Sequence, residues 1–305
     1  MDEGSRPVAS LDGGLDLRAT VESGQSYLWR RADGGTYRDG GEDGAWYHVA
    51  LPSTATATND PEVVRVRQTD GALAWEASTP NGHARLRELL RLEDDLDAIL
   101  AGTPDDSLLE RSVDAHRGMR LVRDPPFASL VSFICSAQMR VARIHVMQTA
   151  LAERYGESIT FRGETYHAFP TAERLADASE ADLRNLGLGY RAPYVRETAA
   201  MVADGTAHPA DALGREYEAA REFLTRFVGV GEKVADCVAL FSLGYLQAVP
   251  LDTWIRTAIA DHYPDCDRGS YVETSRAIRE RFGGEYAGYA QTYVFHYLRN
   301  RAGGG

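Results

Sequence analysis

The hydrophobic pattern of this 305-residue chain changes its period once, close to residue 83. Between residues 14 and 78, short apolar and aromatic runs alternate with polar residues and are separated by turns. Candidate strands are 15–21, 27–29, 46–49 and 63–66, the last of them before the Asp70-Gly71 turn. A period of two is typical of β-strands, so this part predicts an antiparallel sheet of hairpins. From His83 onward, apolar residues recur every three or four positions, which indicates amphipathic helices.

The helical part predicts several separate helices. Pro125-Pro126 opens one long helical pattern that continues through Met147 and ends at Gly156. Further helices are expected at 171–186, 193–204, 211–227 and 232–243, with a tight hairpin at 228–231 between the last two. The sequence therefore predicts an α+β protein, with an N-terminal antiparallel β-sheet domain at 1–95 and a larger helical domain at 96–305.

The charge of the chain at first argues against a nucleic-acid partner. The net charge is −12, whereas phosphate binding normally requires a basic surface. Of the 33 basic residues, however, only Lys233 is a lysine. An acidic, lysine-poor composition indicates adaptation to molar salt, where the screening length falls to about 3 Å and a distant acidic surface hardly repels DNA. Local arginine clusters, rather than net charge, then indicate the partner.

Cysteine content and hydropathy exclude several classes of protein. Cys135, Cys237 and Cys266 are an odd number without close spacing, so neither a disulfide framework nor a four-thiolate metal site is expected. We expect no metal and no other cofactor. No apolar run approaches the roughly 20 residues that cross a bilayer, and the first residues do not resemble a signal peptide. The sequence predicts a cytoplasmic protein without a membrane partner.

The hairpin at 228–231 and the residues after it are candidates for chemistry. Gly229 and Gly231 allow a sharp turn, and the free N–H groups of the following helix start form an anion site suited to a DNA phosphate. Such a turn between helices is most often only a turn. Lys233 lies in the first helical turn, where the helix dipole disfavours a cation and favours the neutral, nucleophilic amine. A surface charge is the ordinary role of lysine, but this chain has no other lysine.

Two further positions add a carboxylate and an amide–aromatic pair. Asp252 follows Lys233 by 19 residues and precedes a helical pattern, so it fits a helix N-cap. A capping carboxylate held by N–H groups stays ionised and is able to stabilise positive charge on a sugar. Gln291 and Phe295 are four residues apart on one helix face, where they either fill the core or bind an extruded base.

Taken together, the segments resemble the eukaryotic-type 8-oxoguanine DNA glycosylases of the helix-hairpin-helix (HhH-GPD) superfamily, here with the salt adaptation of a halophilic archaeon. The matching segments are SGQSY at 23–27, SFICS at 132–136, TYHAFP at 165–170, LGLGYRA at 186–192, GVGEKVADC at 229–237, QAVPLD at 247–252 and YAGYAQ at 286–291. The resemblance implies a helix-hairpin-helix at about 211–244 and a helical domain in two subdomains with the active-site cleft between them. It also implies a monomer that acts on double-stranded DNA at the nucleoid.

The resemblance implies a role for each matching residue. Lys233 is the amine that attacks the sugar C1′, expels the base and leaves a Schiff base, after which β-elimination cuts the strand. Asp252 is the carboxylate that supports this step. The Gly24 carbonyl accepts the N7 hydrogen of 8-oxoguanine, which guanine lacks because its N7 is an acceptor. The flipped base is held by Cys237 and Phe295 on its two faces and by Gln291 on its pairing edge, in a pocket that includes Phe241.

The resemblance also assigns contacts to the opposite strand. Arg143 and Arg191 recognise the orphaned cytosine, Tyr190 wedges the opened duplex, and Gly229 and Gly231 approach the backbone. The chain departs from the family at four places: Gln138-Met139-Arg140 replaces a triple-Asn stretch, Trp254 a phosphate-binding His, Phe241 a Met, and Val228 a Pro. Because of these departures, the opposite-base preference and the identity of the residue that fills the gap left by the base are open. Gln138 is the candidate for that residue.

Two alternatives remain from the residues alone. One is a monofunctional alkylated-base glycosylase of the 3-methyladenine type, which uses only the aspartate and releases the base with water. Lys233 argues against it, and the cysteine count excludes the iron-sulfur branch of the superfamily. The other is a non-catalytic helix-hairpin-helix DNA-binding protein in which Lys233 holds phosphate, an alternative that leaves Asp252 and Gly24 unexplained.

Overall fold

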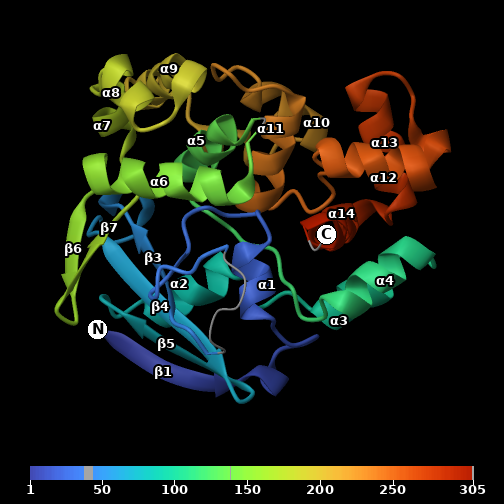
Figure 1. The fold of residues 1–305 in the computed structure, drawn as a ribbon, viewed down its shortest axis with the longest axis horizontal. Coiled ribbons are helices and arrows are strands. Elements are labelled where there is room, and N and C mark those ends of the chain that lie inside the picture. The colour runs from blue at the N-terminus through green and yellow to red at the C-terminus, as the bar shows by residue number, and fades with distance from the viewer. Residues whose placement is uncertain (38–43, 138, 304–305) are drawn as a thin grey trace.

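The N-terminal part of the chain folds into a five-stranded antiparallel sheet (Figure 1). The structure is a computed structural model that describes residues 1–37, 44–137 and 139–303. The strand order is β1-β5-β4-β3-β2, and every neighbouring pair is antiparallel. The strands are β1 (Asp2–Pro7), β2 (Arg30–Arg31), β3 (Tyr47–Leu51), β4 (Glu62–Thr69) and β5 (Ala72–Ala77). The alternating apolar residues of β5 pack on one face into the core, as the period of two requires.

The sheet confirms part of the sequence prediction and corrects the rest. The strands predicted at 46–49 and 63–66 correspond to β3 and β4, and the Asp70-Gly71 turn joins β4 to β5. The strand predicted at 15–21 is wrong, because Leu17–Glu22 forms helix α1, capped by the Asp16 carboxylate on the Ala19 N–H at 2.8 Å. The strand predicted at 27–29 is also wrong: this segment is buried but irregular, and Tyr27 packs against Phe133. Strand β1 was not predicted, since its residues are mostly small and polar.

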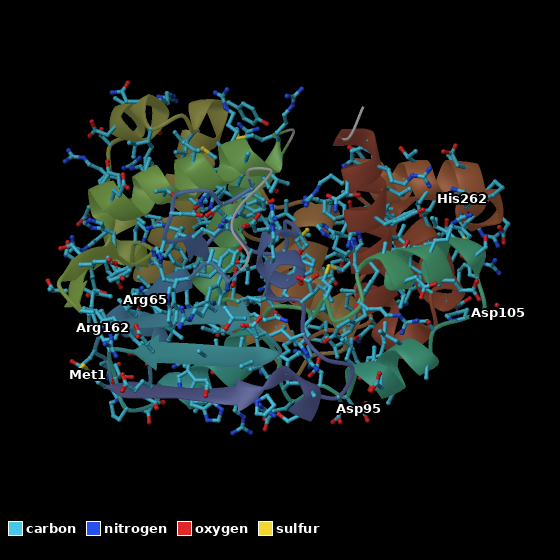
Figure 2. All side chains as sticks on the ribbon, turned by 60° about the horizontal axis from the view of Figure 1, so that its bottom comes forward. Met1, Arg65, Asp95, Asp105, Arg162 and His262 are labelled. Atoms are coloured by element: carbon cyan, nitrogen blue, oxygen red, sulfur yellow. The ribbon has the colours of Figure 1, made fainter. Side chains whose placement is uncertain are left out.

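A second, two-stranded sheet joins this unit to the helices. Strands β6 (Ser158–Phe161) and β7 (Glu164–His167) form a hairpin whose apolar side packs on Val63 of β4. On the rim, Arg65 and Arg162 both pair with Glu76, at 3.6 and 3.1 Å, and lie at the same end of the sheet in Figure 2. The sequence prediction missed this hairpin, which lies between two predicted helices.

The remainder of the chain is helical. The helices are α2 (Gly82–Leu89), α3 (Leu96–Ala101), α4 (Ser107–Ala115), α5 (Pro126–Ser136), α6 (Val141–Tyr155), α7 (Ala172–Ala176), α8 (Glu180–Asn185), α9 (Ala192–Ala203), α10 (Tyr217–Leu224), α11 (Glu232–Val238), α12 (Thr253–His262), α13 (Tyr271–Arg281) and α14 (Ala287–Gly303). A π-helical turn (Ala239–Leu243) continues α11. None of the described helices is long and apolar enough to cross a membrane.

The single long helix predicted after Pro125-Pro126 is wrong. Helices α5 and α6 are separate, because the chain extends at Ala137 and again at Arg140. The Ala137 carbonyl accepts a hydrogen bond from the Arg191 guanidinium, so a side chain that is distant in sequence replaces a helical partner. Apolar periodicity continues across the break, which is why the sequence pattern did not reveal it.

Two hydrophobic clusters divide the helical part, as the resemblance implied. One contains α5, α6 and α9–α11 and is continuous with the sheet. The other contains α4 and α12–α14, with Leu108, Ile255 and Val294 among its members. In Figure 1 the first group lies at the upper left and centre, and the second lies at the right, with α4 below α12 and α14. The predicted α+β class, with an N-terminal sheet followed by a two-part helical region, is confirmed.

Candidate active site

A cavity of about 760 Å³ opens between the two helical groups. Its walls come from α5, α6 and α11 on one side and from α12 and α14 on the other. The volume lies within the range of about 300–1,000 Å³ that is usual for small-molecule sites. All seven residues predicted for catalysis or base binding line it: Gly24, Lys233, Cys237, Phe241, Asp252, Gln291 and Phe295.

Lys233 enters the cavity from the first turn of α11. Gly231 is the N-cap of this helix, which confirms the predicted position of the lysine. The Lys233 Nζ donates a hydrogen bond to Ser136 Oγ at 3.4 Å and lies 5.7 Å from the centre of the Phe133 ring. No acidic side chain among the described residues forms an ion pair with Lys233 within 4.0 Å. The amine is therefore partly buried, weakly bonded and able to reach a ligand.

Asp252 faces the same cavity from the start of α12. Its Oδ1 accepts the Ile255 N–H at 2.8 Å, so the predicted N-cap is confirmed. Burial raises the pKa of this carboxyl above its ordinary value, although the N–H donors, Lys233 and then Arg299 act in the opposite direction. The sequence predicted an ionised carboxylate from capping alone and did not anticipate the burial. Lys233 is close enough to favour the charged form of Asp252 without a direct ion pair.

A buried bridge connects the two helices that carry these groups. Asp236 lies on α11 between Lys233 and Cys237 and is fully buried. Its carboxylate accepts hydrogen bonds from the Tyr217 and Tyr271 hydroxyls, at 2.6 and 2.8 Å. The Tyr271 hydroxyl in turn accepts the Leu251 N–H, one residue before Asp252, at 3.1 Å. This bridge fixes the spacing between the helix of the amine and the loop of the carboxylate.

Aromatic rings and a thiol form the inner wall. Cys237 lies one turn after Lys233 on the same face of α11, as predicted, and its burial raises the pKa of the thiol to about 12. Phe241 belongs to the π-helical turn and stacks on Phe133 with ring centres 5.7 Å apart. Tyr27 meets the same Phe133 ring edge-on at 5.9 Å. The wall is apolar apart from the cysteine, which suits the face of a flat heterocycle.

Gly24 brings a main-chain segment from the N-terminal unit to this wall. Its φ is +96°, a region that favours glycine, and an added Cβ would lie 3.0 Å from Arg299 Nη1 and 3.5 Å from the Phe295 ring. The next residue, Gln25, anchors the segment through hydrogen bonds to the Thr20 and Arg120 carbonyls and from the Val122 N–H. The Gly24 carbonyl accepts no hydrogen bond from any residue that the structure describes.

The opposite wall comes from α14. Gln291 is buried, and its Oε1 accepts a hydrogen bond from the Thr292 hydroxyl at 3.3 Å. Phe295, one turn later, is partly exposed to the cavity and has the Arg299 guanidinium 5.4 Å from its ring centre. The predicted shared helix face of Gln291 and Phe295 is confirmed. Both side chains line the cavity, so they do more than fill the core.

The described residues that are predicted to contact DNA do not line the cavity. Gly229 has a φ of +81°, and a Cβ there would lie 2.7 Å from the Tyr194 ring, so the hairpin requires glycine. Gly231, by contrast, has extended backbone and open space around it. Tyr190 is 54% exposed, whereas Arg191 is 6% exposed and packs 4.4 Å from the Tyr190 ring centre.

Two other predicted contacts are less defined. Arg143 is exposed in the first turn of α6. Gln138 lies outside the described residues, although Met139 and Arg140 beside it line the cavity. The opposite-strand roles of these residues stay predictions.

The structure adds cavity residues to which the sequence assigned no role. Among them are Tyr27, Phe133, Trp254, Arg256 and Arg299. Tyr27 and Phe133 stand in the sequence only as parts of the matching motifs. Arg299 is one helical turn beyond Phe295, and this spacing would have indicated that it shares the helix face of Phe295. Among the described residues, no three His, Cys, Asp or Glu side chains gather in a way that suits a metal ion.

The site can now be compared with known proteins. The pattern described as "HhH-GPD superfamily base excision DNA repair protein" matches residues 131–283. The chain is also 30% identical to the "Probable N-glycosylase/DNA lyase" of Methanothermobacter thermautotrophicus, with 94% of each protein covered. The chain belongs to the HhH-GPD superfamily of base excision DNA repair proteins.

Other members of the superfamily are similar over nearly the whole chain. An N-glycosylase/DNA lyase of Arabidopsis thaliana is 28% identical over 92% of this chain and 76% of its own length. The 8-oxoguanine glycosylase/lyase of Clostridium acetobutylicum, solved with double-stranded DNA containing cytosine opposite 8-oxoguanine, is 28% identical, with 94% and 93% of the two chains covered and a TM-score of 0.80. The predicted membership in the glycosylase superfamily is thus confirmed.

Proposed function

We propose that this protein excises 8-oxoguanine from double-stranded DNA and then cuts the strand at the resulting abasic site. The observation that carries this proposal is the placement of the only lysine of the chain and of Asp252 on one cavity that is large enough to hold a purine. The similar proteins named as glycosylase/lyases support it. A monofunctional glycosylase has no need of an amine at this position, and a DNA-binding module has no need of the cavity.

The proposed reaction uses these two groups in sequence. The neutral Lys233 amine forms a bond to C1′ of the flipped nucleotide while the bond from C1′ to the base nitrogen breaks. The bond electrons leave with the base, which takes up the proton that the attached amine gives up, and the ionised Asp252 stabilises the positive charge that develops on the sugar. The sugar ring opens to a Schiff base on Lys233. Loss of a C2′ proton then expels the 3′ phosphate oxygen and cuts the strand.

Recognition of the base is assigned to the cavity walls. The free Gly24 carbonyl accepts the N7 hydrogen that only the oxidised base offers. Cys237 on α11 and Phe295 on α14 line the cavity and are assigned to the two faces of the base, with Gln291 assigned to its pairing edge. Phe241 supports the inner wall through its stacking on Phe133.

Contact with the opposite strand is assigned to residues outside the cavity, of which Arg191 is buried beside Tyr190. Arg143 and Arg191 are proposed to recognise the orphaned cytosine, exposed Tyr190 to wedge the duplex, and the hairpin at Gly229 and Gly231 to approach the phosphates. We keep Gln138 as the candidate that fills the gap left by the base. We also propose that the protein acts as a monomer in the cytoplasm, at the nucleoid. Its two proposed domains are residues 1–95 and 96–305.

Borohydride trapping tests the proposal. The protein is incubated, in high salt, with a duplex containing 8-oxoguanine opposite cytosine, and the Schiff base is reduced with borohydride as it forms. The expected result is a covalent protein–DNA adduct that a Lys233→Gln variant does not form. Base release without an adduct would indicate a monofunctional glycosylase, and binding without base release would indicate a non-catalytic module.

A further inference from the structure

One arginine connects the two segments that are proposed to recognise the base. Arg299 lies on α14, one turn after Phe295, and lines the active-site cavity. Its Nη1 donates a hydrogen bond to the Ser23 carbonyl at 2.5 Å, and its Nη2 donates one to the Glu22 carbonyl at 3.0 Å. A C-terminal helix is thereby attached to the main chain just before Gly24, about 270 positions earlier in the sequence.

The surroundings of Arg299 leave it few other partners. The same guanidinium lies 5.4 Å from the Phe295 ring centre and 3.1 Å from His296 Nδ1. Burial lowers the pKa of His296 to about 2, so this imidazole is neutral and its Nδ1 is able to accept. No carboxylate among the described residues lies within 4.0 Å of the guanidinium. A partly buried cation held mainly by main-chain carbonyls loses much of its hydration, which is costly unless the cation has a role.

The geometry at Gly24 suggests that use. The backbone there has φ +96° and is not part of a helix or strand, so no ladder of hydrogen bonds fixes its direction. Two anchors are the Gln25 amide on one side and Arg299 on the other, where the Ser23 hydroxyl also donates to the Thr20 carbonyl. The Gly24 carbonyl lies between these two anchors, and its direction depends on both.

We propose that Arg299 is a positioning residue for damage recognition, which directs the Gly24 carbonyl towards the base and sets its distance from the Phe295 ring. This inference rests on the proposed excision of 8-oxoguanine. The hydrogen bonds of Arg299 reach the Gly24 loop and α14 but neither Lys233 nor Asp252, so its positioning role concerns the base. On Asp252 it acts only through its charge, which lowers the pKa of that carboxyl, and Arg299→Lys keeps this charge.

The test compares two substrates that differ only in the presence of the base. One duplex carries 8-oxoguanine opposite cytosine, and the other carries a preformed abasic site opposite cytosine. Base release is measured by single-turnover kinetics with alkaline cleavage, and strand cutting at the abasic site is measured without alkali. In Arg299→Gln we expect base release to fall about tenfold or more, while cutting of the abasic duplex changes by less than about twofold.

Matched variants separate positioning from a loss of structure. Arg299→Lys keeps the charge and a donor, so it is expected to restore part of the base release. Arg301→Gln, on the exposed side of the same helix, removes an arginine whose described side-chain hydrogen bond goes to the Tyr297 hydroxyl, and both rates should stay at the wild-type level. If thermal melts show that Arg299→Gln is not folded, base release and abasic-site cutting are compared in Arg299→Lys instead.

A double variant tests whether Arg299 acts through Gly24. If it does, Gly24→Ala and Arg299→Lys together slow base release by less than the product of the two single effects. Multiplying effects would overturn the inference, as would an equal fall of both rates in Arg299→Gln or no fall in either. Failure of the wild-type protein to release 8-oxoguanine would instead refute the proposed function.

Discussion

The catalytic pair and the recognition walls of this cavity are built in different ways. Lys233 and Asp252 lie 19 residues apart at the starts of two consecutive helices, α11 and α12. Gly24 and Phe295 come from opposite ends of the chain and meet through tertiary packing, with Arg299 joining α14 to the Gly24 loop. The chemistry thus depends on local structure, while recognition depends on tertiary contacts. The two functions should therefore be separable by mutation.

The largest effect is expected at the nucleophile. Lys233→Gln removes the amine, and strand cutting should fall by at least about 10⁴-fold, on both 8-oxoguanine and preformed abasic duplexes, as for the loss of other enzymic nucleophiles. Lys233→Arg, which keeps the charge, is the matched control and should be equally inactive. Activity of Lys233→Arg near the wild-type level would mean that charge, not nucleophilicity, is required.

A smaller loss is expected at the carboxylate. Asp252→Asn keeps an oxygen to cap the Ile255 N–H but removes the negative charge near the sugar. Base release should fall by about 10²–10³-fold, the size usual for one electrostatic group in an active site. Binding of the lesion duplex, measured by fluorescence anisotropy, should remain within a few-fold of wild type. A loss of binding equal to the loss of rate would assign Asp252 a structural role only.

The same carboxylate predicts a pH dependence. Because burial raises the pKa of Asp252, acid protonates it at a higher pH than an ordinary aspartate. The required charge is present above that pKa and lost below it, so base release should fall by about tenfold per pH unit on the acidic side. A pH–rate profile of Asp252→Asn should lack this acidic limb; an unchanged limb in the variant would assign it to another group.

A recognition defect without a chemical defect is expected at Gly24. An alanine there has to adopt a φ of +96° with its Cβ 3.0 Å from Arg299 Nη1. Left-handed backbone costs about 1–2 kcal/mol, so base release should slow about tenfold while abasic-site cutting persists. Gly163→Ala, in the β6–β7 turn with φ +80° and open space, is the matched control for backbone strain. Equal losses in both variants would point to general destabilisation.

The smallest effect on activity is expected in the bridge behind the catalytic pair. Tyr271→Phe leaves the Leu251 N–H without its acceptor and removes the hydroxyl donor from Asp236 Oδ2, which keeps the Arg221 guanidinium at 3.7 Å. Thermal or denaturant unfolding should show a loss of about 1–3 kcal/mol, with only a few-fold change in rate. Tyr297→Phe, whose hydroxyl accepts a bond from exposed Arg301, should cost less. Unchanged stability in Tyr271→Phe would show that the bridge does not hold the two helices.

The same contrast explains what the sequence could predict. The catalytic groups were predictable because a helix N-cap and a first-turn lysine leave local signals, and both positions are confirmed. The break between α5 and α6 was not predictable, because the hydrogen bond at the break comes from Arg191, which is 54 residues from Ala137 in the sequence. Helix α1 was mistaken for a strand because six residues fit either period, and the Asp16 cap decided the outcome. The role proposed for Arg299 likewise becomes visible only once the two ends of the chain meet.

Identification of the residue that is bonded to the sugar tests directly whether Lys233 is the nucleophile. The protein is trapped with borohydride on 8-oxoguanine duplex, digested, and its DNA-linked peptide is sequenced by mass spectrometry. Because Lys233 is the only lysine, the chain offers one other primary amine, at its N-terminus. We expect the adduct on Lys233. An adduct on the Met1 amine, or complete base release with no adduct, would contradict it.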